Sequence, residues 1–159
     1  MRKAFVGLAA LLMLAVLVQI FLAGSGAFDT APNDEAFGLH RTLGYATVLL
    51  TAVMALVAAL ARLPGRLIGM SGLVTGLGIL QPVISMIAKA FGDPGDTTTT
   101  AGQLVFGLHA VNGLIMVYLA RLILQQARER TDTAHTTRAA AGDGSLAAEP
   151  AAGSTRSAS

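Results

Sequence analysis

Apolar and polar residues are distributed along the chain in long blocks rather than at short intervals. Four apolar blocks cover residues 4–23, 38–61, 67–90 and 102–124. Each is close to the ~20 residues that a helix needs to cross a bilayer. The polar segment between the second and third blocks is a short turn containing Pro64 and Gly65. The pattern therefore predicts four membrane-spanning helices joined by short connections.

These blocks predict an all-α fold: a transmembrane four-helix bundle built from two similar helical hairpins. We expect this domain to occupy residues 1–126. Residues 127–159 are polar and rich in alanine, glycine, serine and threonine, and such a composition buries too little apolar surface to fold alone. We expect a disordered cytoplasmic tail there. Arg2 and Lys3 before the first block resemble the start of a signal peptide, but the block exceeds the ~7–15 residues of a signal core, so we interpret it as a span.

Composition supports the membrane assignment and excludes several classes of site. The chain is 53% hydrophobic and 13% charged, whereas soluble domains average about a quarter charged residues. The absence of cysteine excludes disulfides, thiolate metal sites and c-type haem attachment. The net charge of +2 gives no reason to expect a nucleic-acid partner. Because no motif of a soluble enzyme is present, we do not expect an enzyme on its own. The expected partner is the lipid bilayer.

The basic residues predict the orientation of the spans. Of the 11 lysines and arginines, all but Arg41 and Lys89 fall on one side: before the first span, between the second and third, or from the end of the fourth onward. Loops on the cytoplasmic side carry an excess of such residues. Both termini should therefore be cytoplasmic, and Arg41 and Lys89 should lie near the outer surface.

A repeated motif, F-G-L-H-x-x-x-G, opens the second and fourth spans at residues 37–44 and 106–113. It places His40 and His109 at matching positions, while the third histidine, His135, lies in the polar tail. Ionisable side chains inside spans are costly and usually mark a functional site. Each hairpin also has a glutamine late in its first helix, Gln19 or Gln81. We interpret the pattern as a parallel internal repeat that places both histidines at one depth in the outer half of the membrane.

Histidines and glycines together favour a flat cofactor between the second and fourth spans. Gly44 and Gly113 follow the histidines by one helical turn, and Gly38 and Gly107 precede them by two residues. Missing side chains let a helix or a flat ligand approach closely. Porphyrin iron has two axial positions that two neutral imidazoles can fill. The sequence therefore favours one haem b near the outer face, ligated by His40 and His109, in an electron-transfer protein.

The pattern resembles membrane-bound cytochrome b proteins, in which four-helix bundles hold haem between paired histidines with glycines nearby. Members that carry electrons across the membrane typically hold two haems with four histidines, whereas this chain has two histidines in its spans. The resemblance thus implies one haem near one face and no complete route across the bilayer. The chain is also similar to small four-span bacterial integral membrane proteins of an uncharacterised family. That similarity implies a multi-pass protein of the bacterial plasma membrane and supplies no function.

Other polar residues are candidates for the surroundings of such a haem. Ligating histidines usually donate their second N–H to a carbonyl or a polar side chain, and Asn112, Thr47 and Gln81 are candidates for this role. Arg41 and Lys89 are the cations expected near haem propionates. Arg41 has a second interpretation, in which it reaches the outer lipid headgroups.

The same residues support other interpretations. In one, the histidines only make interhelical hydrogen bonds in a non-catalytic membrane subunit or scaffold. In others, they bind another metal, relay protons, or contact a quinone or a redox partner. Two histidines are too few for a closed zinc site, and the spans contain no carboxylate of the kind that proton pathways use. The sequence assigns no oligomeric state, electron donor or electron acceptor.

Overall fold

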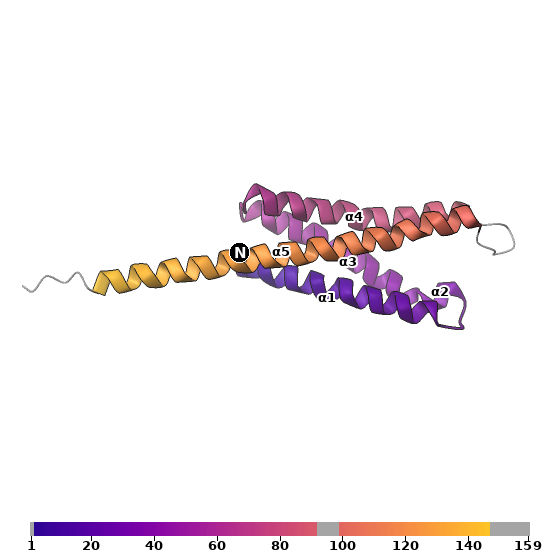
Figure 1. The fold of residues 1–159 in the computed structure, drawn as a ribbon, viewed down its shortest axis with the longest axis horizontal. Helices are drawn as coiled ribbons and strands as arrows, with labels where there is room; N and C mark the ends of the chain where they lie inside the picture. The colour runs from indigo at the N-terminus through magenta and orange to yellow at the C-terminus, as the bar shows by residue number, and fades with distance from the viewer. Residues whose placement is uncertain (1, 92–98, 147–159) are drawn as a thin grey trace, which may run out of the picture.

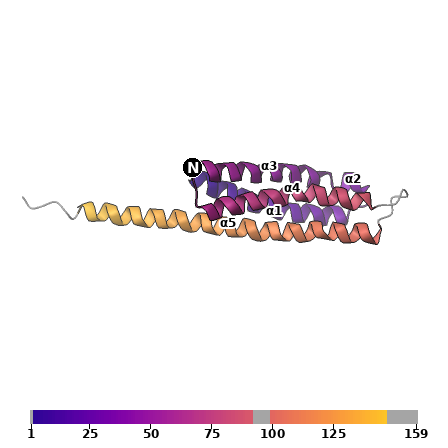
Figure 2. The ribbon, with the colours of Figure 1, turned by 90° about the horizontal axis from the view of Figure 1, so that it is seen from above.

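The computed structural model confirms the predicted all-α fold (Figures 1 and 2). It describes residues 2–91 and 99–146, with side chains placed as far as Arg130. The elements are α1 (Arg2–Ala27), α2 (Asn33–Ala36), α3 (Gly38–Leu60), α4 (Gly65–Ala90) and α5 (Thr100–Leu146). All except the short α2 are long and apolar enough to cross a membrane.

The four long helices form a bundle of two antiparallel hairpins, α1 with α3 and α4 with α5. Each long helix packs against two others: α3 contacts α1 and α4, and α5 contacts α4 and α1. Consequently α1 and α4 lie on one diagonal of the bundle, and α3 and α5 lie on the other. Helices α3 and α5 run in the same direction, so the starts of both lie at one end of the bundle (Figures 1 and 2).

Two elements differ from the sequence prediction. Helix α2 was not predicted, because four residues are too few to give a periodic pattern. Helix α5 continues to Leu146, past the predicted end at residue 124 and into the segment expected to be a tail. Gln125, Arg128 and Glu129 are good helix formers, and extending an existing helix needs no new nucleation. Residues 147–159, the remainder of the expected tail, lie outside the described residues.

The turn between α3 and α4 connects the two hairpins at the end of the bundle opposite the motifs. Leu63 N–H donates to Ala58 O at 3.0 Å, and Arg62 N–H donates to Ala59 O at 3.0 Å. This pair of bonds is a Schellman motif, in which the residue at the position of Arg62 adopts a left-handed conformation. Arg62 has φ 48°, in a position where glycine is usual.

The interior of the bundle changes from apolar to polar between its two ends. The half nearer the α3–α4 turn has a continuous apolar core, in which Leu12, Met54, Val74 and Ile123 have no exposed surface. The half that contains the motifs has histidines, glutamines and glycines facing the interior instead. Large apolar side chains cover the outside of the bundle, as lipid contact requires. The fold is therefore that of a multi-pass membrane protein.

Candidate functional site

His40 and His109 come together in the half of the bundle opposite the α3–α4 turn, although α3 and α5 lie on a diagonal. Their ring centroids are 6.1 Å apart, and the ring planes are inclined by 52°. His40 is the third residue of α3 and His109 is the tenth residue of α5, and each side chain is half-buried. Because the two helices run in parallel, matching positions in the motif reach matching depths. The repeat thus brings its two histidines to one place.

Each imidazole is oriented by a backbone carbonyl in its own hairpin. His40 Nδ1 lies 3.1 Å from Gln19 O on α1, and His109 Nδ1 lies 3.2 Å from Gln81 O on α4. A carbonyl oxygen can only accept a hydrogen bond, so these contacts require a proton on Nδ1. In a neutral imidazole, Nε2 then has a free lone pair. This is the tautomer that a metal bound at Nε2 requires.

Two of the four motif glycines are packed against the same glutamines. A Cβ atom at Gly44 would lie 3.2 Å from the end of the Gln19 amide, and one at Gly113 would lie 3.3 Å from the end of the Gln81 amide. The space left by these glycines is therefore occupied by glutamine amide groups. Gly38 and Gly107 differ, because a Cβ atom at either would have no neighbour within 4 Å. Only the glycines that follow the histidines contribute to the contacts of the site.

The motif phenylalanines also contact the histidines, although sequence reasoning did not single them out. Phe37 meets His40 edge-on, with centroids 6.2 Å apart. Phe106 stacks on His109, with centroids 5.2 Å apart and planes inclined by 4°. Residues three apart on a helix share a face, so the phenylalanine three positions before each histidine was the signal that could have identified this contact.

The Gln81 side chain gives the second hairpin additional hydrogen bonds. In the amide orientation that satisfies its neighbours, Nε2 donates to His109 O at 3.1 Å and Oε1 accepts from Gly113 N–H at 3.3 Å. Nε2 also lies 3.0 Å from His109 Nδ1. That nitrogen therefore has two competing partners: the Gln81 carbonyl requires it to be protonated, and the Gln81 amide requires it to be bare.

The corresponding Gln19 side chain is less well satisfied. Its Oε1 is buried and has no hydrogen-bond partner among the described residues. A buried polar atom without a partner is unfavourable by about 1–3 kcal/mol. The first hairpin therefore retains an unused acceptor close to His40.

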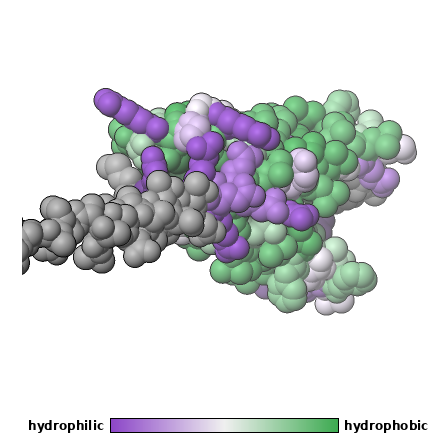
Figure 3. All heavy atoms as spheres, turned by 60° about the vertical axis from the view of Figure 1, so that its left-hand side comes forward, coloured by the Kyte–Doolittle hydropathy of each residue, from purple (hydrophilic) through white to green (hydrophobic). Residues whose placement is uncertain are grey.

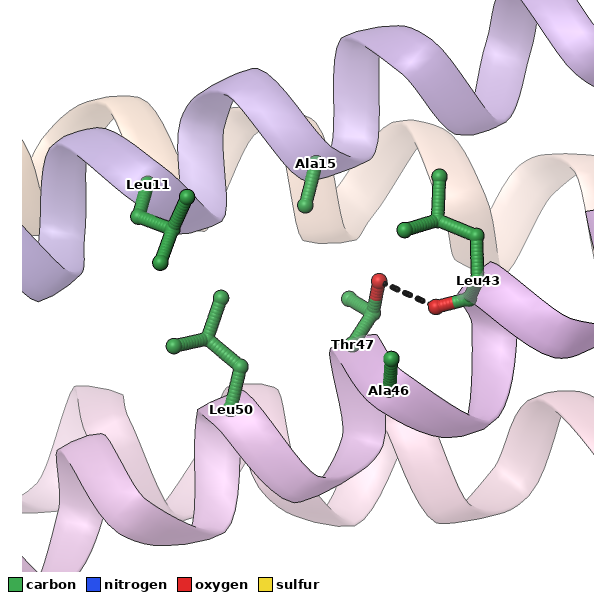
Figure 4. Close-up of a pocket in the computed structure, with 6 residues that line it drawn as sticks. All are labelled: Leu11, Ala15, Leu43, Ala46, Thr47 and Leu50. Atoms are coloured by element: carbon green, nitrogen blue, oxygen red, sulfur yellow. Dashed lines mark hydrogen bonds between the residues drawn. The ribbon is translucent and has the colours of Figure 1, made fainter.

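Asn112 and Thr47, both expected as partners of the histidines, bond elsewhere. Asn112 Nδ2 donates to Leu77 O on α4 at 2.8 Å. Thr47 Oγ1 donates to Leu43 O in its own helix at 2.8 Å, beside a crevice of about 210 Å³ between α1 and α3 (Figure 4). Backbone carbonyls of the glutamines, rather than these side chains, contact the imidazoles.

Arg41 is exposed at the motif end of the bundle and forms an ion pair with Asp34, with Nη1 2.6 Å from Oδ1. The hydrogen bond and the charge of Arg41 hold the pKa of the Asp34 carboxyl below its usual value, and the charge of Lys89 lowers it further. Arg41 therefore pairs directly with this exposed carboxylate, and Lys89 acts on it through its charge alone. Arg41 follows His40 in the sequence but is engaged with Asp34.

The metal-binding capacity of the site is limited to the two imidazoles. Within residues 2–91 and 99–130, no group of three or more histidine, cysteine, aspartate or glutamate side chains gathers. A haem needs only two axial ligands from the protein, because the porphyrin supplies the others. The donor set is thus compatible with haem iron.

The fold and the site together define a multi-pass integral membrane protein with a paired-histidine site in the half of its bundle opposite the α3–α4 turn. Residues 19–88 match the model of a family of unknown function, DUF6220. The matched segment begins at Gln19, includes the first motif and Gln81, and ends before His109. No curated protein matches the chain. No solved structure matches it either.

Proposed function

We propose that the protein binds one haem b between α3 and α5, with His40 and His109 as axial ligands, and transfers electrons within the membrane. The observation that carries this proposal is the meeting of two imidazoles, 6.1 Å apart, from helices on a diagonal of the bundle. A metal–nitrogen bond is about 2 Å long. Two imidazoles that share one metal therefore have centroids about 6 Å apart, in agreement with this spacing.

The hydrogen bonds of the imidazoles support the same assignment. Both Nδ1 atoms lie within 3.2 Å of a carbonyl oxygen, an arrangement typical of metal-ligating histidines. It fixes the ring orientation and leaves Nε2 available as a ligand. When bound, haem would supply a one-electron redox couple. The role of this chain is to hold the imidazoles and to exclude water from them.

The residues around the imidazoles fit a flat ligand if the glutamine side chains can turn aside. The amide groups of Gln19 and Gln81 lie against the surfaces that Gly44 and Gly113 leave open. Glutamine side chains have several rotatable bonds, so this movement does not disturb the helices. Gln19 Oε1 has no hydrogen-bond partner in the described part of the chain, which makes the movement less costly in the first hairpin. Arg41 and Lys89 are the outer cations nearest to where propionates would lie.

The proposal includes an orientation in the membrane. With both termini in the cytoplasm of a bacterium, the histidines lie in the outer half of the plasma membrane, where a quinone or a soluble redox partner would exchange electrons with the haem. The arginines at the opposite end support this orientation, because basic residues favour the cytoplasmic side.

A second candidate function is supported by the contacts of Gln81. Its amide bonds both His109 O and Gly113 N–H, so it ties α4 to α5 without any cofactor. In this alternative the site joins helices, and the protein is a non-catalytic membrane subunit or scaffold. Bonds of this kind between membrane helices contribute about 0.6 kcal/mol on average.

An absorption spectrum of the detergent-purified protein from haem-replete cells distinguishes the two candidates. Haem ligation predicts a low-spin b-type spectrum with a sharp band on reduction. The double variant His40→Ala/His109→Ala should lose this spectrum, whereas His135→Ala should retain it, because residue 135 lies outside the bundle. A colourless protein that remains well folded would contradict the haem proposal and support the scaffold.

A further inference from the structure

The end of the bundle opposite the histidines contains a cavity of about 890 Å³. It is formed by the start of α1, the α3–α4 turn, and the part of α5 just beyond its apolar span. Figure 3 shows hydrophilic residues gathered where α5 leaves the bundle, beside the apolar sides. The charged residues that line the cavity are Arg2, Arg62, Arg66, Arg130 and Glu129.

The cavity is amphipathic. Its other lining residues include Phe5, Leu63 and Leu67, which belong to the apolar core and are 1%, 8% and 1% exposed. Its polar lining therefore surrounds an apolar floor. Its volume lies within the range of about 300–1,000 Å³ that is usual for small-molecule sites.

The charges in this cavity are unbalanced. Four arginines and one glutamate line it, so positive side chains outnumber negative ones. The first turn of α4 contains Arg66 and no acidic residue, although the positive end of a helix favours acidic side chains. An anion in the cavity would relieve this repulsion.

Arg62 has a backbone conformation that its side chain does not favour. It occupies the left-handed position of the Schellman motif, with φ 48°, where glycine would be unstrained. Strained residues of this kind are often retained where their side chains have a function. At this position the guanidinium group is one of those lining the cavity.

We propose that this cavity binds the headgroup of an anionic phospholipid. The guanidinium groups would hold the phosphate, for which arginine is well suited because it can donate two parallel hydrogen bonds. The apolar floor would contact the adjoining glycerol and acyl carbons. Basic pockets between membrane helices on the cytoplasmic side bind headgroups of this class. A lipid fits better than free phosphate, because free phosphate has no use for the apolar floor.

Thermal unfolding of the purified full-length protein in a neutral detergent tests this site. Phosphatidylglycerol should raise the unfolding midpoint, and phosphatidylcholine should not. Arg62→Gly and Arg66→Gln should each weaken the dependence on phosphatidylglycerol roughly fivefold, the contribution of one arginine near an anionic surface. Without lipid, Arg62→Gly should not lower the midpoint, because glycine suits the left-handed position. This last result separates loss of binding from loss of folding.

Arg128→Gln is the matched control, because Arg128 is an exposed arginine of α5 that does not line the cavity. It should leave the dependence on phosphatidylglycerol unchanged. An equal loss in all three variants would mean that only the overall charge matters and would overturn the proposal. So would the absence of any shift with phosphatidylglycerol. If inorganic phosphate alone reproduced the shift and abolished the effect of the lipid, the site would be one for free phosphate, and the lipid assignment would be wrong.

Discussion

The two hairpins make the same contacts at the centre of the site and different contacts around it. In each, a histidine Nδ1 lies within 3.2 Å of a glutamine carbonyl of the preceding long helix. A glycine one turn later is packed against the amide of the same glutamine. The two imidazoles lie 6.1 Å apart, so a change in the position of one alters the surroundings of the other. The comparison shows that the two hairpins share the same contacts only around the two histidines, where the halves meet.

The surroundings differ in how each hairpin uses its polar groups. The second hairpin has Asn112 and the Gln81 amide, both bonded across the helix pair. In the first, Leu43 occupies the position that corresponds to Asn112, and Gln19 Oε1 has no partner among the described residues. The first hairpin is instead joined to α2 at the surface, through Arg41. We conclude that the second hairpin is held together by hydrogen bonds in its interior and the first by a surface ion pair at the motif end.

The largest expected effect is the loss of the haem spectrum on removing either histidine, which tests whether both hairpins contribute a ligand. If both imidazoles ligate one haem, His40→Ala and His109→Ala should each abolish the b-type spectrum or convert the iron to high spin, because either loss opens a coordination position. Absorption and electron paramagnetic resonance spectra would measure this. A variant that keeps a normal low-spin spectrum would show that its histidine is not a ligand, and the shared site would be wrong.

A smaller effect is expected from adding a methyl group to a glycine that packs closely against the backbone in each hairpin. A Cβ atom at Gly26 would lie 2.9 Å from Ala36 O, and one at Gly102 would lie 3.0 Å from Ala88 O. Backbone atoms cannot move aside as a side chain can, so Gly26→Ala and Gly102→Ala should each lower the free energy of unfolding by about 1–3 kcal/mol.

Chemical unfolding in detergent would measure these changes, with Gly72→Ala as the control. A Cβ atom at Gly72 has no neighbour within 4 Å, so this variant should lose no stability. Equal losses in all three variants would mean that the contacts at Gly26 and Gly102 are unimportant.

Removing the interior hydrogen bond of the second hairpin should have a still smaller effect on stability. Asn112 is 5% exposed, and its bond to Leu77 O has no counterpart in the first hairpin. Asn112→Leu, which makes the second motif resemble the first at this position, should reduce stability by about 0.6–1 kcal/mol. Thr47→Val is the control, because its hydroxyl bonds within its own helix. A gain in stability for Asn112→Leu would show that apolar packing outweighs this bond.

The smallest effect on stability should come from removing the exposed ion pair between Arg41 and Asp34. The pKa of Asp34 is lower in the folded protein than its ordinary value of 3.8. Its carboxylate therefore stabilises the fold at pH values above 3.8. This contribution should disappear as the pH falls from 3.8 through the lower pKa of the folded protein. Asp34→Asn should remove that part of the pH dependence and change little else, because the pair is exposed. An unchanged profile in the variant would show that the ion pair does not contribute.

Hydropathy and the repeated motif were sufficient to predict the four spans and to single out His40 and His109, because both depend only on which amino acids occur at which positions. The partners of the imidazoles were harder to predict. They are backbone carbonyls, which every residue has, so no residue type marks them. Asn112 and Thr47 were plausible partners by chemistry, but their side chains bond carbonyls closer to them. Likewise, the extension of α5 depends on helix propensity beyond the membrane, which hydropathy does not measure.

The change of the bundle interior from apolar to polar has a consequence for permeability. A polar site in a membrane protein risks becoming part of a leak for ions and protons if water reaches it from both sides. Here the half nearer the α3–α4 turn is closed by Leu12, Met54, Val74 and Ile123, none of which has exposed surface. Hydrophobic constrictions of this kind exclude water. The histidines can therefore exchange only with the membrane side at the motif end of the bundle, while the other half separates them from the opposite side.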